Sequence, residues 1–206
     1  MAKYFDVHPD NPQPRAVRQI ADSVREGALI AYPTDSCYAL GCGLGSREGV
    51  QRIRSIRHLD DRHHFTLVCQ DFAQLGQFVR VDNDVFRAIK ASTPGSYTFI
   101  LPATREVPRM LQHPQEEDGG GAHPGPRRHP GPALGARRAA AVEHAAAARR
   151  GGADDAGWEI KDRLDHVVDA VVDSGDCGTE PTTVIDFSGG EAEIVRRGAG
   201  DTSRFE

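Results

Sequence analysis

The chain has 206 residues, enough for one domain with a sizeable core. Its formal net charge of −5 excludes a protein whose whole surface binds nucleic acid, so any basic site has to be local. No apolar run approaches the roughly 20 residues of a membrane helix, and the polar N-terminus has no signal-peptide pattern. We therefore expect a soluble cytoplasmic protein that does not enter membranes.

The four cysteines show no spacing that is typical of a metal site. They form no C-x-x-C pair, and no histidine lies at metal-ligand spacing from them. We expect buried thiols in a reducing compartment rather than a redox site, and no metal bound by protein side chains. The cysteines are Cys37, Cys42, Cys69 and Cys177.

Helical and extended patterns alternate along the first half of the chain. The helical segments carry apolar residues on one face, and several begin at residues that favour helix N-termini. The extended segments are short apolar or aromatic runs, which suit buried strands. The expected helices run from Pro14 to a stop at Gly27, from the N-cap Ser46 through Ile56, from Asp71 through Val79, and over 84–91. The expected strands are 28–32, 65–69 and 96–103.

The last quarter of the chain continues the same alternation. Apolar residues at helical spacing from Ile160 to Val171 predict an amphipathic helix. Residues 182–187 and 193–196 predict the last two strands. The whole pattern indicates an α/β chain with a mixed, twisted sheet.

Residues 115–156 differ from the chain on either side. Leu134 and Val142 are their only large aliphatic residues, and roughly seven in ten of them are Ala, Gly, Arg or Pro. Codons whose first two letters are both G or C encode those four amino acids alone. The tract therefore resembles GC-rich coding sequence read out of frame.

Reading the same bases one position forward tests this interpretation. The stretch from Gln115 then gives three Lys or Arg codons followed by Thr or Met, and the string KKKTVGVRIP is allowed. The codons for 143–145 give Asn or Ser followed by Thr or Met, and ordinary patterning returns at Trp158. The alternative is a genuine disordered insertion, because so few large apolar residues cannot offset the entropy of ordering. The run AAAVEHAAAARR could also form a helix from propensity alone. We expect the tract as a whole to be irregular or loosely packed.

A polar segment follows the expected strand at 28–32. Thr34, Ser36 and Tyr38 precede closely spaced glycines there. Hydroxyls and free backbone amides at the end of a strand suit a small polar ligand or a phosphate, and an ordinary turn has the same composition. Both interpretations stay open at this point.

Basic residues gather in two places. The first group follows Ser46 and forms either a solvated cationic face or a phosphate-binding patch. In the second, arginines beside glycines near the C-terminus suit two-pronged binding of an anion. The first group is Arg52, Arg54, Arg57, Arg62, His63 and His64, and the second is Arg196 and Arg197.

Together these segments resemble the YrdC/YciO family, and its YciO branch in particular. They cover nearly all of the chain outside 115–156. In that gap the family carries a basic motif and a Ser/Thr-rich strand, and the shifted frame restores a close relative of both. The segments are HPDNPQPR, YPTDSCYALG, IRSIRHLDDRHHFTLVC, TPGSYTFIL, EVPRML, EIKDRLDHVVD, PTTVIDFSG and VRRGAGD.

The resemblance implies one YrdC-like domain over 1–206, a twisted mixed sheet flanked by helices around a basic cavity. The best-known members are threonylcarbamoyl-AMP synthases, which join ATP, L-threonine and bicarbonate for a tRNA modification and release pyrophosphate. Mg²⁺ is expected with the ATP. We therefore expect a synthase of this type or a related enzyme that makes or breaks down the threonylcarbamoyl-adenylate. The family is also described as binding double-stranded RNA, so an RNA- or tRNA-binding protein without catalysis is the alternative.

The resemblance also implies site residues, matched motif by motif. Thr34, Ser36 and Tyr38 fall at the threonine end of the cavity, while no catalytic residue is assigned. Ala39, Leu59, Asp60 and His63 depart from the synthase pattern, as is typical of the YciO branch. The chain as written lacks the basic motif and the Ser/Thr strand, so we expect it to be inactive or poorly folded. The residues expected to bind nucleotide and phosphate are Arg54, Arg57, His63, Thr182 and Arg196.

Overall fold

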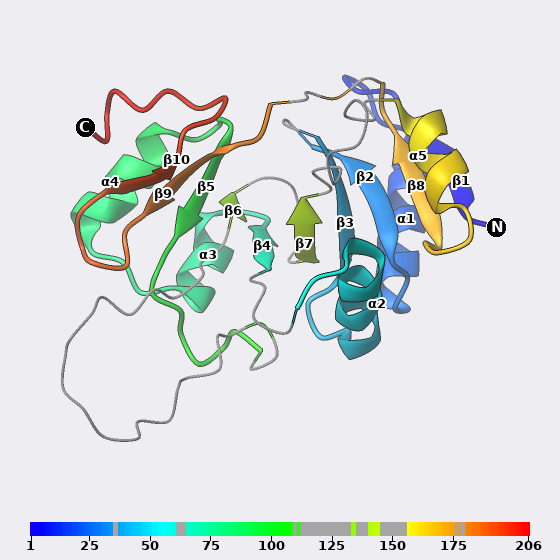
Figure 1. Cartoon of the computed structure of the whole chain (residues 1–206), viewed down its shortest axis with the longest axis horizontal. Coiled ribbons are helices and arrows are strands. Elements are labelled where there is room, and N and C mark those ends of the chain that lie inside the picture. Colours follow the sequence, from blue (N-terminus) through cyan, green and yellow to red (C-terminus); the bar gives the residue numbers. More distant parts are fainter. Residues whose placement is uncertain are drawn as a thin grey trace. The chain divides into compact units, whose positions relative to one another are not determined.

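A computed structural model of the chain describes residues 1–34, 37–60, 65–108, 111, 133–134, 140–144, 156–175, 177 and 180–206. The chain folds into two compact units, each built from two stretches of sequence (Figure 1). Unit 1 comprises Met1–Asp61 and Ala140–Pro181, and unit 2 comprises Arg62–Ala139 and Thr182–Glu206. That the whole chain is a single domain stays a prediction.

Unit 1 is built on a mixed sheet with the strand order β1-β8-β2-β3-β7. Strand β8 pairs in parallel with β1 and with β2, while β3 pairs antiparallel with β2 and with β7. The strands are β1 (Lys3–Asp6), β2 (Ile30–Pro33), β3 (Tyr38–Gly43), β7 (Ala140–His144) and β8 (Ala170–Asp173).

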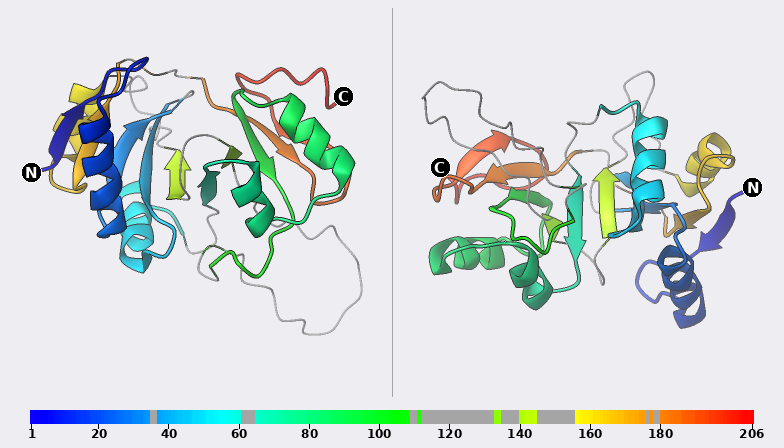
Figure 2. Two further views of the ribbon diagram at one scale, coloured as in Figure 1. Left: turned by 180° about the vertical axis from the view of Figure 1, so that it is seen from behind. Right: turned by 90° about the horizontal axis from the view of Figure 1, so that it is seen from below.

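Three helices cover this sheet. They are α1 (Pro14–Arg25), α2 (Arg47–Arg57) and α5 (Gly157–Leu164). The views in Figures 1 and 2 show α2 and α5 on one face and α1 on the other. The Ser46 hydroxyl accepts a hydrogen bond from the Gly49 N–H at 3.0 Å, so the predicted N-cap of α2 is confirmed.

Unit 2 contains a parallel pair, β4 (Thr66–Cys69) with β6 (Ala133–Leu134), and a three-stranded sheet. In that sheet β9 (Thr183–Asp186) pairs antiparallel with β10 (Glu193–Arg196) and in parallel with β5 (Tyr97–Ile100). The helices are α3 (Phe72–Phe78) and α4 (Asn83–Ala91), which meet through an edge-to-face contact of Phe72 and Phe86.

The predicted α/β class with a mixed sheet is confirmed, as are the helices starting at Pro14, Ser46 and Asp71. The predicted helix from Ile160 to Val171 is wrong in its second half, because α5 ends at Leu164 and Val171 lies in β8. Strands β1 and β3 were not expected. The glycines of β3 give it the composition of a turn. Gly41 is needed in this strand, because a Cβ atom at position 41 would lie only 2.8 Å from the Tyr32 ring.

The tract 115–156 contains two of the strands. Residues of β6 and β7 fall inside it, and β7 pairs with β3 from Ala39↔His144 to Gly43↔Ala140. Irregular structure is therefore a wrong expectation for these two strands. Apart from them and Ala156, the tract lies outside the described residues.

Candidate functional site

The expected threonine end belongs to unit 1, where Thr34 and Tyr38 lie on the hairpin of β2 and β3. Thr34 and Cys37 close this hairpin through their backbones and the Thr34 hydroxyl. The Thr34 N–H donates to the Cys37 carbonyl at 2.9 Å, and the Cys37 N–H donates to Thr34 Oγ1 at 3.2 Å. Ser36, expected beside them, lies outside the described residues.

Tyr38 has a different environment from the one its motif suggests. Its side chain is only 1% exposed, and its hydroxyl donates to Asp173 Oδ1 over 3.4 Å. Burial, together with the nearby Asp173 carboxylate, raises the pKa of Tyr38 well above its usual value. The phenol is therefore held neutral inside unit 1.

The basic group on α2 separates into residues with different roles. Arg52 donates to Asp169 Oδ2 at 2.6 Å and to the Val167 carbonyl at 2.9 Å, which fastens α2 to the segment before β8. Burial opposes ionisation of Asp169, but hydrogen bonds from Arg52 and from the Leu29 N–H keep the pKa of Asp169 below its usual value. Arg52 is thus a structural residue.

Arg54 and Arg57 lie in the last turn of α2, which ends at His58 with a left-handed backbone. Cations are favoured there because the carbonyl end of a helix carries a partial negative charge. The Nε atom of Arg57 is buried and has no hydrogen-bond partner within the described part of the chain. His63, the third basic residue expected here, lies outside the described residues.

Unit 2 brings two of the predicted nucleotide residues into direct contact. The Arg196 guanidinium donates to the Thr182 carbonyl from Nε at 3.2 Å and from Nη2 at 2.9 Å. The Thr182 hydroxyl lies 2.8 Å from the hydroxyl of Thr98, which the sequence did not single out. Arg196 is exposed and forms no ion pair with a described carboxylate, so its charge is available to an anion.

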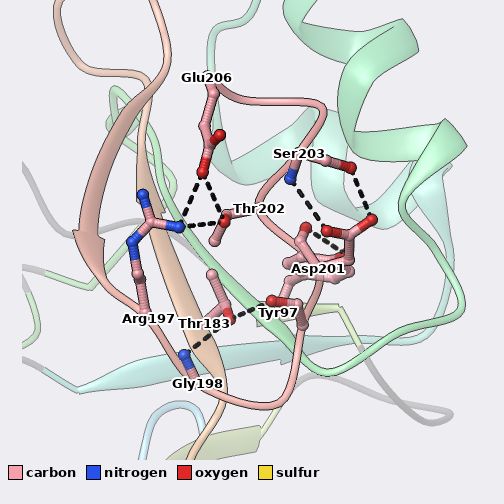
Figure 3. A network of polar contacts seen from close by, with 9 residues as sticks. Tyr97, Thr183, Arg197, Gly198, Asp201, Thr202, Ser203 and Glu206 are labelled. Atoms are coloured by element: carbon pink, nitrogen blue, oxygen red, sulfur yellow. Dashed lines mark hydrogen bonds and ion pairs between the residues drawn. The ribbon is translucent and has the colours of Figure 1, made fainter.

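The neighbouring Arg197 is bound in the C-terminal segment instead. Its guanidinium donates to Glu206 Oε1 at 2.8 Å and to the Thr202 hydroxyl, as the dashed lines in Figure 3 mark. Because Glu206 neutralises Arg197, only one arginine of this pair presents an uncompensated charge within the described residues. Hydrogen bonds from Arg197 and Thr202 lower the pKa of Glu206.

The chain beside Arg196 is held by a buried threonine. Thr183 Oγ1 accepts from the Gly198 N–H at 3.0 Å and donates to the Gly200 carbonyl at 2.6 Å. Tyr97 donates to the Asp201 carbonyl at 2.8 Å (Figure 3). These bonds fix the backbone on the C-terminal side of Arg196.

Three further expectations concern metals, thiols and membranes. In the described ranges, no group of three or more His, Cys, Asp or Glu side chains lies together in a way that would hold a metal ion. Cys42 and Cys69 are buried, as expected, while Cys37 and Cys177 are half-buried. None of the described helices is long and apolar enough to cross a membrane.

Comparison with known sequences identifies the relatives of the chain. Residues 22–120 match the family model of Sua5, YciO and YrdC, which is described as telomere recombination. The chain is 42% identical to YciO of Escherichia coli strain K12 over 212 residues, covering all of both proteins. It is 34% identical over 105 residues to a threonylcarbamoyl-AMP synthase of Chromobacterium violaceum, covering 50% of this chain and 54% of that one.

Solved structures agree with these relationships. The crystal structure of E. coli YciO is similar with a TM-score of 0.87 at 38% identity, covering all of both chains. The P. abyssi Sua5 structure complexed with L-threonine has a TM-score of 0.77 at 20% identity, covering 95% of this chain and 57% of that one, and shares the fold. The chain belongs to the YciO branch of the YrdC/YciO family.

Proposed function

We propose that this protein handles a threonylcarbamoyl-adenylate, in the synthetic direction from ATP, L-threonine and bicarbonate. In that reaction the threonine amine and bicarbonate give a carbamate with loss of water. The carbamate oxygen then attacks the α-phosphorus of ATP and expels pyrophosphate. Mg²⁺ enters as part of the nucleotide substrate, since anionic phosphates need a cation in this chemistry.

The observation that carries the proposal is the state of Arg196. Its guanidinium uses one edge to bind the Thr182 carbonyl, which fixes its orientation, and no described carboxylate neutralises it. An oriented, unpaired guanidinium suits a phosphate because it supplies both charge and directed hydrogen bonds. The adjacent Thr182 hydroxyl adds a polar group that is held in place by Thr98.

Arg57 supports the same assignment from unit 1. Burial of a guanidinium Nε without a hydrogen bond is costly, and a bound anion would relieve that cost. We assign Arg54, Arg57 and His63 to nucleotide or phosphate binding by motif, together with Thr182 and Arg196. Thr34 and Ser36 are assigned to the threonine end in the same way.

The relatives add the substrate class. The C. violaceum relative is named as a threonylcarbamoyl-AMP synthase, and the P. abyssi Sua5 structure is that of a complex with L-threonine. Both relationships concern the same fold and family as this chain. They support threonine and ATP as the pair of substrates to test first.

Binding measurements test the proposal before turnover is considered. We expect ATP with Mg²⁺ and L-threonine each to bind in calorimetric titrations, and L-serine to bind more weakly than L-threonine. The titrations should use the full chain and a frame-restored variant, in which the codons for 115–156 are read one base forward. The proposal would be contradicted if neither the full chain nor the frame-restored variant binds ATP or L-threonine.

An RNA-binding role gives a different result in the same preparations. A protein that only binds RNA would retain double-stranded RNA in a salt-sensitive way and would show no threonine-dependent effect on ATP binding. We therefore include a duplex RNA titration at two salt concentrations. RNA retention combined with no ATP and no threonine binding would replace the proposed function with the RNA-binding one.

A further inference from the structure

Three strands of unit 1 bring Tyr4, Tyr38 and Asp173 together. Asp173 ends β8, which pairs in parallel with β1, and Asp6 is its partner in that register. Tyr4 belongs to β1, and Tyr38 is the first residue of β3. The two phenols thus come from strands on either side of β8.

Both phenols use the Asp173 carboxylate. The Tyr4 hydroxyl donates to Oδ2, and the Tyr38 hydroxyl donates to Oδ1 over 3.4 Å. The Gly175 N–H donates to the same Oδ1 at 2.8 Å, and the Val7 N–H donates to the Asp173 carbonyl at 2.7 Å. The carboxylate is therefore anchored independently of Tyr38.

Helix α5 closes over this carboxylate. A Cβ built on Gly157, the first residue of α5, would overlap the Asp173 carboxyl group, so only glycine permits this approach. The first turn of a helix presents free N–H groups and a partial positive charge, which favour an anion. The fold thus holds the Asp173 carboxyl group against the Tyr38 hydroxyl.

Tyr38 connects this carboxylate to the hairpin that carries Thr34. Tyr38 pairs with Pro33 across β2 and β3, directly beside the hydrogen bonds between Thr34 and Cys37. Because the Tyr38 side chain is 1% exposed, its hydroxyl meets Asp173 rather than solvent. A group buried in this way orients its neighbours, since its own position is fixed.

We propose that Asp173 is a positioning residue for the threonine end, acting through Tyr38 on the Thr34–Cys37 closure of the hairpin. The inference rests on the proposed function for the identity of the ligand, L-threonine. It changes the role that the motif implies for Tyr38, from a ligand contact to the link between Asp173 and Thr34.

Amide hydrogen exchange at Cys37 tests the positioning without any ligand. In the full chain, we expect Asp173→Ala and Tyr38→Phe each to accelerate exchange at Cys37 by about tenfold. The double variant should be no faster than the faster single variant, because both changes break one linkage. Asp173→Asn, which keeps an acceptor oxygen, should restore most of the protection.

Two variants separate positioning from a general loss of stability. Tyr4→Phe removes the other phenol from the same carboxylate and should change exchange at Cys37 by less than about twofold. Gly157→Ala pushes the Asp173 carboxylate aside without altering a polar group, and should accelerate amide exchange at Cys37 several-fold. Unchanged exchange at Cys37 in both Tyr38→Phe and Gly157→Ala would overturn the inference, even where Asp173→Ala fails to fold.

Threonine affinity supplies the second readout, in the full chain and in the frame-restored variant. We expect Asp173→Ala and Tyr38→Phe to weaken L-threonine binding by about tenfold and Tyr4→Phe to leave it within about twofold. If the variants change amide exchange at Cys37 as described but the unsubstituted proteins do not bind L-threonine, the positioning role of Asp173 is upheld and the proposed function is contradicted. If L-threonine affinity is the same in Tyr38→Phe and Asp173→Ala as in the unsubstituted protein, the positioning inference is overturned while the proposed function is not.

Discussion

Arg196 and Thr182 are joined by three hydrogen bonds: Nε and Nη2 of the guanidinium donate to the threonine carbonyl, and Nη2 also donates to the threonine hydroxyl over 3.4 Å. The antiparallel pairing of β9 and β10 makes this possible, because it returns Arg196 to the start of β9. Arg197 points its charge at Glu206 instead. Two adjacent arginines therefore differ in whether their charge is neutralised within unit 2.

The first prediction uses this difference. Arg196→Gln is expected to weaken ATP binding by about 10- to 100-fold, the loss of one charge-assisted contact to a phosphate. Arg197→Gln is the matched control and should change ATP affinity by less than about threefold. Calorimetric titration of each variant measures this. Equal losses in the two variants would argue against a specific role for Arg196.

Arg57 gives a second prediction. In the frame-restored variant, Arg57→Ala should weaken adenine-nucleotide binding by about tenfold, because its guanidinium is expected to contact phosphate. Arg25→Ala removes an exposed arginine that pairs with Asp22 on α1, and serves as the control for net charge. Nucleotide affinity that is the same with and without the Arg57 side chain would remove this residue from the site.

Arg52 is expected to affect stability rather than binding. Its ion pair helps to hold the pKa of Asp169 below its usual value, so the pair stabilises the fold at neutral pH and loses this effect as pH falls through the folded-state pKa. Arg52→Met should lower the free energy of unfolding by about 1 kcal/mol at pH 7. The difference from the unsubstituted protein should shrink below about pH 4. Urea unfolding at pH 7 and pH 3 measures it, and a larger difference at pH 3 would refute the assignment.

Thr183 provides a prediction about the C-terminal segment. Its hydroxyl is buried and bonded to the backbone at Gly198 and Gly200. Thr183→Val keeps the shape but leaves both backbone groups without this partner, and should cost about 1–3 kcal/mol of unfolding free energy. Thr202→Val, at the less buried end of the network in Figure 3, should cost less than about 1 kcal/mol. A larger loss for Thr202→Val would reverse this ranking.

The nucleotide sequence of the gene tests the frame interpretation of 115–156. We expect an insertion or deletion before the Lys/Arg codons and a compensating one near 155–157. The register of β7 places position 144 beside Tyr38, because His144 pairs with Ala39. The Ser/Thr codons of the shifted frame correspond to 143–145 and so to this end of β7. A single unbroken frame from Leu111 to Trp158 would disprove a frame error.

The sequence predicts helices in this protein better than strands. Caps and spacing identify α2 and α3, because Ser46 and Asp71 are bonded to the N-terminal N–H groups of those helices. Strand β8 was not predicted because a strand buried in parallel pairing is continuously apolar, and such a run also fits a helix. Strand β1 is short and largely exposed, so it has no apolar alternation.

The site residues of unit 2 were assigned through the family resemblance rather than through local patterns. Thr182 and Arg196 lie at the ends of two consecutive predicted strands, and the structure shows that these strands pair. Tyr38 and Asp173 are 135 residues apart, and their contact depends on β8 lying between β1 and β2. No local pattern specifies that strand order, so Asp173 could be found only in the folded chain.

Pyrophosphate release tests the central claim most directly. The frame-restored protein, supplied with ATP, Mg²⁺, L-threonine and bicarbonate, should release pyrophosphate only when all of them are present, and Arg196→Gln should reduce the rate much more than Arg197→Gln. The chain as written should release little or none under the same conditions. Release that is independent of threonine and bicarbonate, or no release despite tight binding of ATP and threonine, would contradict the synthetic function.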